Sequence, residues 1–224
     1  MVVDVVSDIV CPWCYIGKRR LEGASAILQR TILRQPIEIR WHPFELNPGI
    51  PPEGITRRDY RTAKFGSWEY SLQLDARVAE NGKQAGITFR HDRMERTPNS
   101  FRAHVLMAAA LRQGVTVQNR VAERLFSGYF TDGEDVGNPT VLFSIGRECG
   151  VDSVSAPEDL DNAGLVDHVR AEERKVRAEG VQGVPLIRFS GEVVSEGAAP
   201  EEMLAARLRE LSAERPERGQ VGEP

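Results

Sequence analysis

Two cysteines separated by two residues, Cys11 and Cys14, stand between a valine-rich segment and a stretch with helical periodicity. Residues 1–10 (MVVDVVSDIV) have the composition of a short buried strand. Pro12 occupies the expected first position of the helix, where its missing N–H removes no hydrogen bond, and the helical pattern continues to about Leu33. A strand that runs into a helix through Cys-Pro-Trp-Cys restricts the fold and the chemistry more than any other segment.

The spacing of the two cysteines indicates a redox site of the thioredoxin type. The first N–H groups of a helix lack internal partners and lie at the positive end of its dipole, so they would stabilise a thiolate at Cys11. That thiolate would attack a disulfide sulfur, and Cys14 would resolve the mixed disulfide. Trp13, between the cysteines, is expected to be partly exposed and to contact the substrate.

Two other uses of the cysteine pair fit the sequence less well. A zinc site needs four ligands, and no second Cys/His pair with matching spacing occurs in the sequence. A structural disulfide across two residues closes too small a loop to stabilise the chain much through entropy. A redox role is therefore the favoured interpretation, and no metal is expected.

Composition excludes several classes of partner. The chain has 224 residues, a formal net charge of −4 and 41% hydrophobic residues, which is enough for a packed core. This charge gives no reason to expect nucleic acid or an anionic membrane as a partner, and no apolar segment is long enough to span a bilayer. The first strand begins at Met1 without a signal-like region, and only three cysteines are present. We therefore expect a cytoplasmic protein.

The middle of the chain is predicted to be mostly helical. Residues 37–41 (IEIRW) alternate as a strand does, and the proline-rich segment 42–54 predicts a loop. Helices are then predicted where apolar residues recur at helical spacing: after a Ser67 cap with Trp68, Leu72, Ala76 and Ala79; from Thr97-Pro98 with Phe101, Val105 and Ala108; with Val117, Val121 and Leu125; from Asn138-Pro139 with Leu142, Ile145 and Cys149; after a Ser155/Glu158 capping box; and over 165–178.

The strand pattern returns near the end of the chain. Residues 184–189 and 192–195 predict a hairpin, and Pro200 precedes a last helix. The order of elements predicts an α/β, thioredoxin-like fold with a large α-helical insertion. Its boundaries are a split thioredoxin-like domain at 1–42 and 181–213, an inserted helical domain at 43–180, and a disordered tail at 214–224.

Gly183-Val184-Pro185 stands at the start of the third strand of the thioredoxin-like unit. Proline removes a donor from a sheet, so it is found at strand starts, edges or bulges. Thioredoxin-like folds carry a cis-proline here, facing the redox pair. We therefore predict a cis bond before Pro185, with Val184 presenting backbone groups to an extended substrate.

Four blocks resemble one family in order along the chain. Residues 6–17 (VSDIVCPWCYIG), 41–47 (WHPFELN), 96–99 (RTPN) with Ala103-His104, and 183–185 (GVP) are similar to the FrnE-like branch of the DsbA thiol–disulfide oxidoreductases. The resemblance covers nearly the whole chain to about Leu211. It implies a DsbA-like fold and dithiol–disulfide exchange on protein or small-thiol substrates.

The resemblance also implies roles for individual residues. It makes Cys11 the exposed nucleophile, Cys14 the resolving cysteine and Pro185 the cis-proline, with Pro12, Trp13 and Val184 completing the substrate site. Asn99 and His104 fall on a helical segment near the redox face and are further substrate-binding candidates; a helix cap or a satisfied core polar group is the alternative for each. Cys149 is interpreted as a buried, inert thiol.

Other activities occur in the same superfamily. The 2-hydroxychromene-2-carboxylate isomerases and kappa-class glutathione transferases share the layout, but they typically place serine where Cys11 stands and use bound glutathione as the thiol. A redox-linked chaperone is a third alternative. No cofactor is expected beyond the Cys11–Cys14 disulfide, with glutathione as an alternative co-substrate, and both a monomer and a homodimer are compatible with these features.

Overall fold

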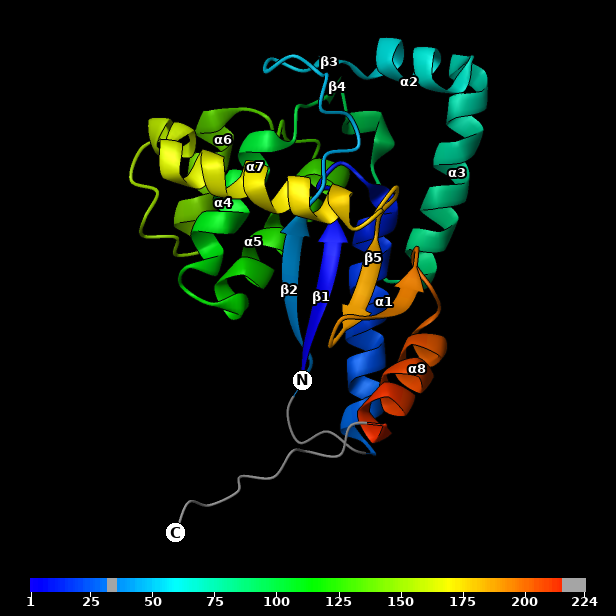
Figure 1. Ribbon diagram of the computed structural model, residues 1–224. Coiled ribbons are helices and arrows are strands. Elements are labelled where there is room, and N and C mark those ends of the chain that lie inside the picture. The colour runs from blue at the N-terminus through cyan, green and yellow to red at the C-terminus, as the bar shows by residue number, and fades with distance from the viewer. Residues whose placement is uncertain (32–35, 215–224) are drawn as a thin grey trace.

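A four-stranded mixed sheet forms the centre of the computed structural model, which describes residues 1–31 and 36–214 (Figure 1). The strand order is β2-β1-β5-β6. β1 (Val2–Ser7) pairs in parallel with β2 (Glu38–Pro43) and antiparallel with β5 (Leu186–Phe189), which pairs in turn with β6 (Glu192–Glu196). β1 therefore lies inside the sheet, between β2 and β5. The loop that follows it, residues 8–11, leads into the helix that begins at Pro12.

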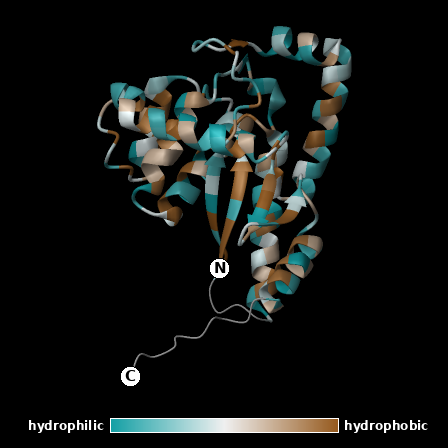
Figure 2. Ribbon diagram, in the orientation of Figure 1, coloured by the Kyte–Doolittle hydropathy of each residue, from teal (hydrophilic) through white to brown (hydrophobic). Residues whose placement is uncertain are grey.

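Helices cover both faces of this sheet. α1 (Pro12–Gln29) and α8 (Glu201–Ala213) pack against each other, behind the sheet in the view of Figure 1, whereas α7 (Ala163–Ala178) crosses in front of it. α4 (Phe101–Leu111) and α5 (Val115–Ser127) contact β2. Apolar residues are concentrated where these layers meet (Figure 2). Buried residues of the sheet, α1 and the inserted helices belong to one continuous core.

The insertion follows β2 and returns to the sheet at β5. It begins with the two-residue strand β3 (Ile55–Thr56), which pairs with β4 (Arg96–Thr97). Between these strands, α2 (Arg57–Phe65) and α3 (Trp68–Gln84) extend along one side of the molecule (Figure 1). α4, α5, α6 (Pro139–Glu148) and α7 complete the insertion. This arrangement is a DsbA-like thioredoxin fold with a helical insertion, as the sequence predicted.

Several local predictions are confirmed. Ser67 accepts a hydrogen bond from the Tyr70 N–H at the start of α3, and Asn138 accepts one from Thr140 ahead of α6. Ser190 and Gly191 both have positive φ (53° and 87°) in the β5–β6 turn, which matches the twist of a tight hairpin. Cys149 is buried. These signals are local, so the sequence carries them directly.

Three predictions about helices are wrong. Leu72, which the helical spacing placed on the apolar face of α3, is 46% exposed. The residues that α3 buries are Ser71, Asp75, Val78 and Gly82. They pack against polar groups of α2 and against Phe89. The segment after Ser155 forms only a short 3-10 helix (Pro157–Asp161), since Asn162 already caps α7. The acid that bonds to Ser155 is Asp159, not Glu158.

The third error concerns the segment before α4. Thr97 and Pro98 do not open a helix, because Thr97 belongs to β4 and pairs with Ile55. α4 starts at Phe101, whose N–H donates to the Asn99 side chain. The predictions for the end of the first helix near Leu33 and for the 214–224 tail fall largely outside the described residues, and α1 ends at Gln29. Over the described residues, no helix is long and apolar enough to cross a membrane.

Candidate redox site

The loop between β1 and α1 places the cysteine pair at the start of a helix. Cys11 is the N-cap residue of α1, with extended backbone (φ −93°, ψ 111°), and Pro12 is the first helical residue. The Cys11 N–H donates to the Asp8 carbonyl (3.1 Å), and the Cys14 N–H donates to the Cys11 carbonyl (3.0 Å). Both thiols are free. Cys11 therefore lies at the N-terminal end of α1, the positive end of the helix dipole.

Cys11 is buried, which corrects the expectation of an exposed nucleophile. The residue is only 4% exposed, and Cys14 is fully buried. The physical reason is the inserted helical domain, which faces the redox loop and encloses a cavity in front of Cys11. Trp13 is 37% exposed, as expected for a residue between the cysteines. Cys11 lines this cavity, so a molecule that enters it can lie against the cysteine.

The start of β5 lies directly against the cysteine. The Val184–Pro185 peptide bond is cis, and the Cys11 thiol donates to the Val184 carbonyl at a sulfur–oxygen distance of 3.7 Å. α1 approaches this loop closely at Gly17, where an added Cβ would lie 3.1 Å from the Pro185 Cγ. A side chain at position 17 would therefore press on Pro185. The three segments predicted to form the site, 11–14, Val184 and Pro185, meet at one point.

The second cysteine is kept protonated in the reduced protein. Burial raises the pKa of Cys14 well above its ordinary value, and the adjacent Cys11 sulfur raises it further. A hydrogen bond from the Asp8 backbone opposes these effects, whereas the charge of the Asp8 carboxylate adds to them. Cys14 is consequently fully buried and protonated, as expected for a resolving cysteine.

The cavity in front of Cys11 has a volume of about 430 Å³, within the range of small-molecule sites. Its walls come from the redox loop, from the loop after β2, from α2 and α3, and from the segment around Tyr129. Trp13, Phe65, Met94 and Phe130 contribute apolar surface, and several arginines contribute charge. The cavity offers both an apolar wall and cationic groups to a molecule that reaches the cysteine.

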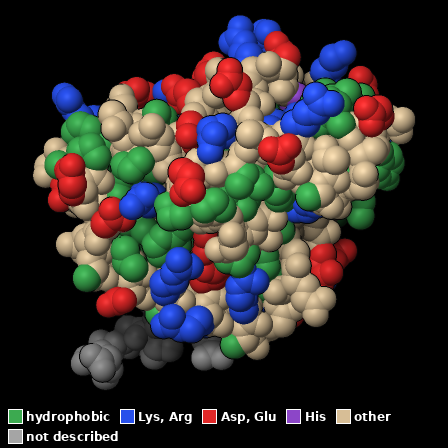
Figure 3. Space-filling model, turned by 90° about the horizontal axis from the view of Figure 1, so that it is seen from above, with side chains coloured by type: hydrophobic (Ala, Val, Ile, Leu, Met, Phe, Trp, Pro, Cys, Tyr) green, Lys and Arg blue, Asp and Glu red, His purple; other side chains and the backbone are tan. Residues whose placement is uncertain are grey.

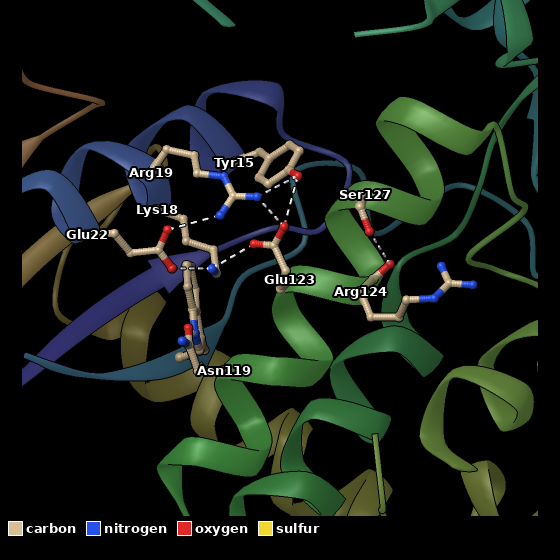
Figure 4. A network of polar contacts seen from close by, with 9 residues as sticks. Tyr15, Lys18, Arg19, Glu22, Asn119, Glu123, Arg124 and Ser127 are labelled. Carbon is tan, nitrogen blue, oxygen red and sulfur yellow. Dashed lines mark hydrogen bonds and ion pairs between the residues drawn. The ribbon is translucent and has the colours of Figure 1, made fainter. Parts of the chain in front are cut away.

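A network of polar contacts attaches α1 to α5 (Figure 4). The Glu123 carboxylate accepts hydrogen bonds from Tyr15 (3.0 Å), Lys18 (2.7 Å) and Arg19. Lys18 and Arg19 also pair with Glu22 on α1 itself. The Tyr15 ring stacks on Phe126 with centroids 5.2 Å apart. The first two turns of the redox helix are thereby attached to the insertion.

Asn99 and His104 do not line the cavity that contains Cys11. The Asn99 side chain donates to the Ile50 carbonyl (2.7 Å) and accepts from Phe101, which ties a loop to the start of α4. His104 is buried, with Nε2 3.5 Å from the Asp8 carboxylate, and its ring lines a separate cavity of about 320 Å³ between the sheet and α7. A direct role for either residue in substrate binding stays a prediction.

Several residues of this region were not predicted from the sequence. Asp8 is fully buried three residues before Cys11, and its carboxylate accepts hydrogen bonds from the N–H groups of Leu46 (2.7 Å) and Val10 (3.3 Å). Arg57, Arg61 and Asp75, on α2 and α3, were also missed. The only sequence signal for Asp8 is a carboxylate within an apolar strand-and-loop segment. Among the described residues, no group of His, Cys, Asp and Glu is arranged to hold a metal ion.

Comparison with known proteins agrees with this geometry. Residues 2–209 match the DSBA-like thioredoxin domain, so the chain belongs to that family of thiol–disulfide oxidoreductases and related proteins. The probable DsbA oxidoreductase SCO1869 from Streptomyces coelicolor is 29% identical in sequence. Its structure superposes with a TM-score of 0.84 over 99% of this chain and 94% of that one.

Two more distant structures share the fold alone. The cytosolic disulfide reductase DsbM from Pseudomonas aeruginosa is 18% identical, with a TM-score of 0.64 over 95% of this chain and all of that one; it has also been solved with GSH. A 2-hydroxychromene-2-carboxylate isomerase is 17% identical, with a TM-score of 0.66 over 96% of this chain and 97% of that one. The narrower assignment to the FrnE-like branch stays a prediction.

Proposed function

We propose that the protein is a thiol–disulfide oxidoreductase that exchanges disulfides through Cys11 and Cys14. The observation that supports this most is the position of the Cys11 sulfur, which lies at the start of α1, 3.7 Å from the Val184 carbonyl and in front of the fully buried Cys14. The arrangement separates an attacking sulfur that lines a cavity from a resolving sulfur that no substrate can reach. It requires no metal or organic cofactor.

The reduced protein acts in two displacements. The Cys11 thiolate attacks one sulfur of a substrate disulfide, the substrate S–S bond breaks, and one substrate thiolate leaves. The Cys14 sulfur then attacks Cys11, gives its proton to the departing thiolate or to solvent, and releases the second substrate thiol. The Cys11–Cys14 disulfide that remains has lost two electrons to the substrate, and the reverse sequence oxidises a dithiol.

The backbone at Val184 and the Trp13 ring orient the substrate. Trp13 is partly exposed beside Cys11 and provides an apolar contact. The Val184 carbonyl lies within reach of Cys11 and marks where the second chain of a mixed disulfide would run. Glutathione or another small thiol would serve as reductant or substrate, in keeping with the GSH complex of the similarly folded DsbM.

Two cysteine variants test this function. We expect Cys11→Ser to lose disulfide reduction in a turbidity assay with insulin and in a small-disulfide assay. We expect Cys14→Ser to accumulate a mixed disulfide on Cys11, which intact-mass spectrometry detects, because the resolving sulfur is absent. Cys149→Ser is the matched control and should retain wild-type rates, since that thiol is buried away from the cavity. Full activity in Cys11→Ser would contradict the proposal.

A further inference from the structure

The cavity in front of Cys11 has an excess of positive charge. Its charged lining consists of four cationic side chains and one carboxylate, all on α2 and α3: Arg57, Arg61, Lys64, Arg77 and Asp75. Burial lowers the pKa of His91, which also lines the cavity, so that this imidazole is neutral at pH 7. The overall chain is acidic, with a net charge of −4. The excess is therefore a local property of this wall.

Two of the arginines share a single buried acid. Arg57 donates to one oxygen of Asp75 (2.6 Å), and Arg61 forms an ion pair with the other (2.7 Å). Arg57 is 4% exposed and Asp75 is 6% exposed. Burial lowers the pKa of Arg61; Asp75 opposes this effect, and Arg57 adds to it. One carboxylate cannot neutralise two guanidinium groups, and both remain charged at neutral pH.

Arg61 is partly buried, and a second cation removed from water beside the same acid is costly unless something compensates it. Asp75 balances one of the two guanidinium charges, so Arg57 and Arg61 together leave one positive charge without a side-chain counterion among the described residues of the cavity wall. Arg61 also donates to the hydroxyl and carbonyl of Ser71, which fixes its direction. In the view from above in Figure 3, Lys and Arg side chains are interspersed with Asp and Glu side chains over this end of the molecule. An anionic group entering the cavity would complete the charge balance.

We propose that this cavity selects small thiols and disulfides that carry a carboxylate. The acid group is bound by Arg57 and Arg61, with Lys64 and Arg77 attracting it from the rim, while the substrate sulfur reaches Cys11 along the apolar wall. The volume of about 430 Å³ and the burial of Cys11 both favour a small molecule over a folded protein. The inference rests on the proposed disulfide exchange, because it names the substrate class of that same site.

The test compares two disulfides that differ only in charge. The reduced protein is mixed with dithiodipropionate or with its neutral diamide, and protein oxidation is followed by intact mass or by tryptophan fluorescence. Each rate is divided by the rate at which dithiothreitol reduces the same disulfide, which removes differences in intrinsic reactivity. We expect the acid to react faster by roughly tenfold or more at low ionic strength, and the preference to shrink as salt is raised.

Charge-removing variants locate the effect. We expect Arg61→Gln to lower the preference for the acid about tenfold, because Arg57 then pairs fully with Asp75. The double variant Lys64→Gln/Arg77→Gln changes only exposed side chains, so it folds in any case, and we expect a severalfold loss of preference. Arg102→Gln is the control, since this arginine pairs with Asp161 on the surface, away from the cavity.

The outcomes separate the two proposals. Equal normalised rates for the acid and the diamide, with exchange active on both, would overturn the substrate class and leave disulfide exchange standing. Exchange with neither of these disulfides nor with insulin would overturn the proposed function itself. An unchanged preference in both Arg61→Gln and the double variant would show that these side chains do not bind the acid.

Discussion

Two polar junctions join the thioredoxin-like part of the molecule to the helical insertion, and they are built differently. At the α1–α5 junction, the acidic and basic side chains of Lys18, Arg19, Glu22 and Glu123 pair with one another. At the second junction, which we call the α7 junction, three buried carboxylates meet: Asp8, Glu45 and Glu173. The first balances charge between helices, whereas the second gathers acids around a loop.

The backbone explains the acids of the α7 junction. The Phe44 N–H still donates to Ser7 of β1, but Glu45 and Leu46 follow the end of β2 without a strand partner, so their N–H groups need other acceptors. Glu173 accepts from the Glu45 N–H (2.8 Å), and Asp8 accepts from the Leu46 N–H (2.7 Å). Arg170 and Arg177, which are more exposed, supply the opposite charge from α7. Buried carboxylates thus replace a missing strand beside the redox loop.

The most disruptive test of this difference removes the shared acid of the α1–α5 junction. Glu123→Ala leaves Lys18, which is 3% exposed, with only Glu22, and it also removes the acceptor of Tyr15 and Arg19. We expect a loss of about 3 kcal/mol in the free energy of unfolding, measured by urea denaturation. The matched control is Glu148→Ala, which breaks an exposed pair with Arg124; it should cost less than about 1 kcal/mol. Equal losses in the two variants would contradict the distinction.

The balanced junction and the fold around it follow largely from local sequence signals. The strand, the Cys11–Cys14 spacing and the helix after Pro12 lie within 29 residues, and each has its own pattern. The hairpin turn and the Ser67 and Asn138 caps are equally local. Such features depend on neighbours in the chain, so the sequence alone could predict them.

The burial of the site could not be predicted in the same way. Cys11 is covered because α2 and α3 lie in front of it. The sequence of α2 (RRDYRTAKF) has no apolar face from which a helix could be predicted. α3 buries Asp75 rather than Leu72, because its partners are arginines of α2. An amphipathic pattern identifies apolar contacts only, so a helix that packs through ion pairs escapes it. The cationic wall of the cavity was missed for that reason.

A smaller effect is expected from one hydroxyl of the α1–α5 junction. Tyr15→Phe keeps the ring stacked on Phe126 and loses the hydrogen bond to Glu123, which should cost about 1 kcal/mol. Burial raises the pKa of Tyr15 to about 12, and the charge of Glu123 contributes. The stability that Tyr15 provides is therefore complete below about pH 10 and is lost as the pH rises towards 12.

Alkaline titration and denaturation check this prediction together. The absorbance at about 295 nm should lose one ionisation step near pH 12 in Tyr15→Phe, and the stability difference from wild type should vanish at that pH. Tyr70→Phe, which alters an exposed residue, is the control and should leave stability unchanged at pH 8. A Tyr15→Phe variant as stable as wild type at pH 8 would mean that the hydroxyl does not support the junction.

The smallest effect is expected at the α7 junction, and its sign depends on pH. Burial raises the pKa of Glu45, and the neighbouring Glu173 raises it further. A raised pKa in the folded protein means that Glu45 supports stability at low pH, where it is protonated, and that this support is lost as the pH rises through the folded pKa. Glu45→Gln has no such titration. Its free energy of unfolding, relative to that of the wild type, should therefore increase as the pH is raised from 4 to 7. We expect a change on the order of 0.5–1 kcal/mol in urea denaturation, with the exposed Glu158→Gln as control. If the stability of Glu45→Gln relative to wild type instead decreases from pH 4 to pH 7, the pair with Arg170 outweighs the repulsion between the buried acids.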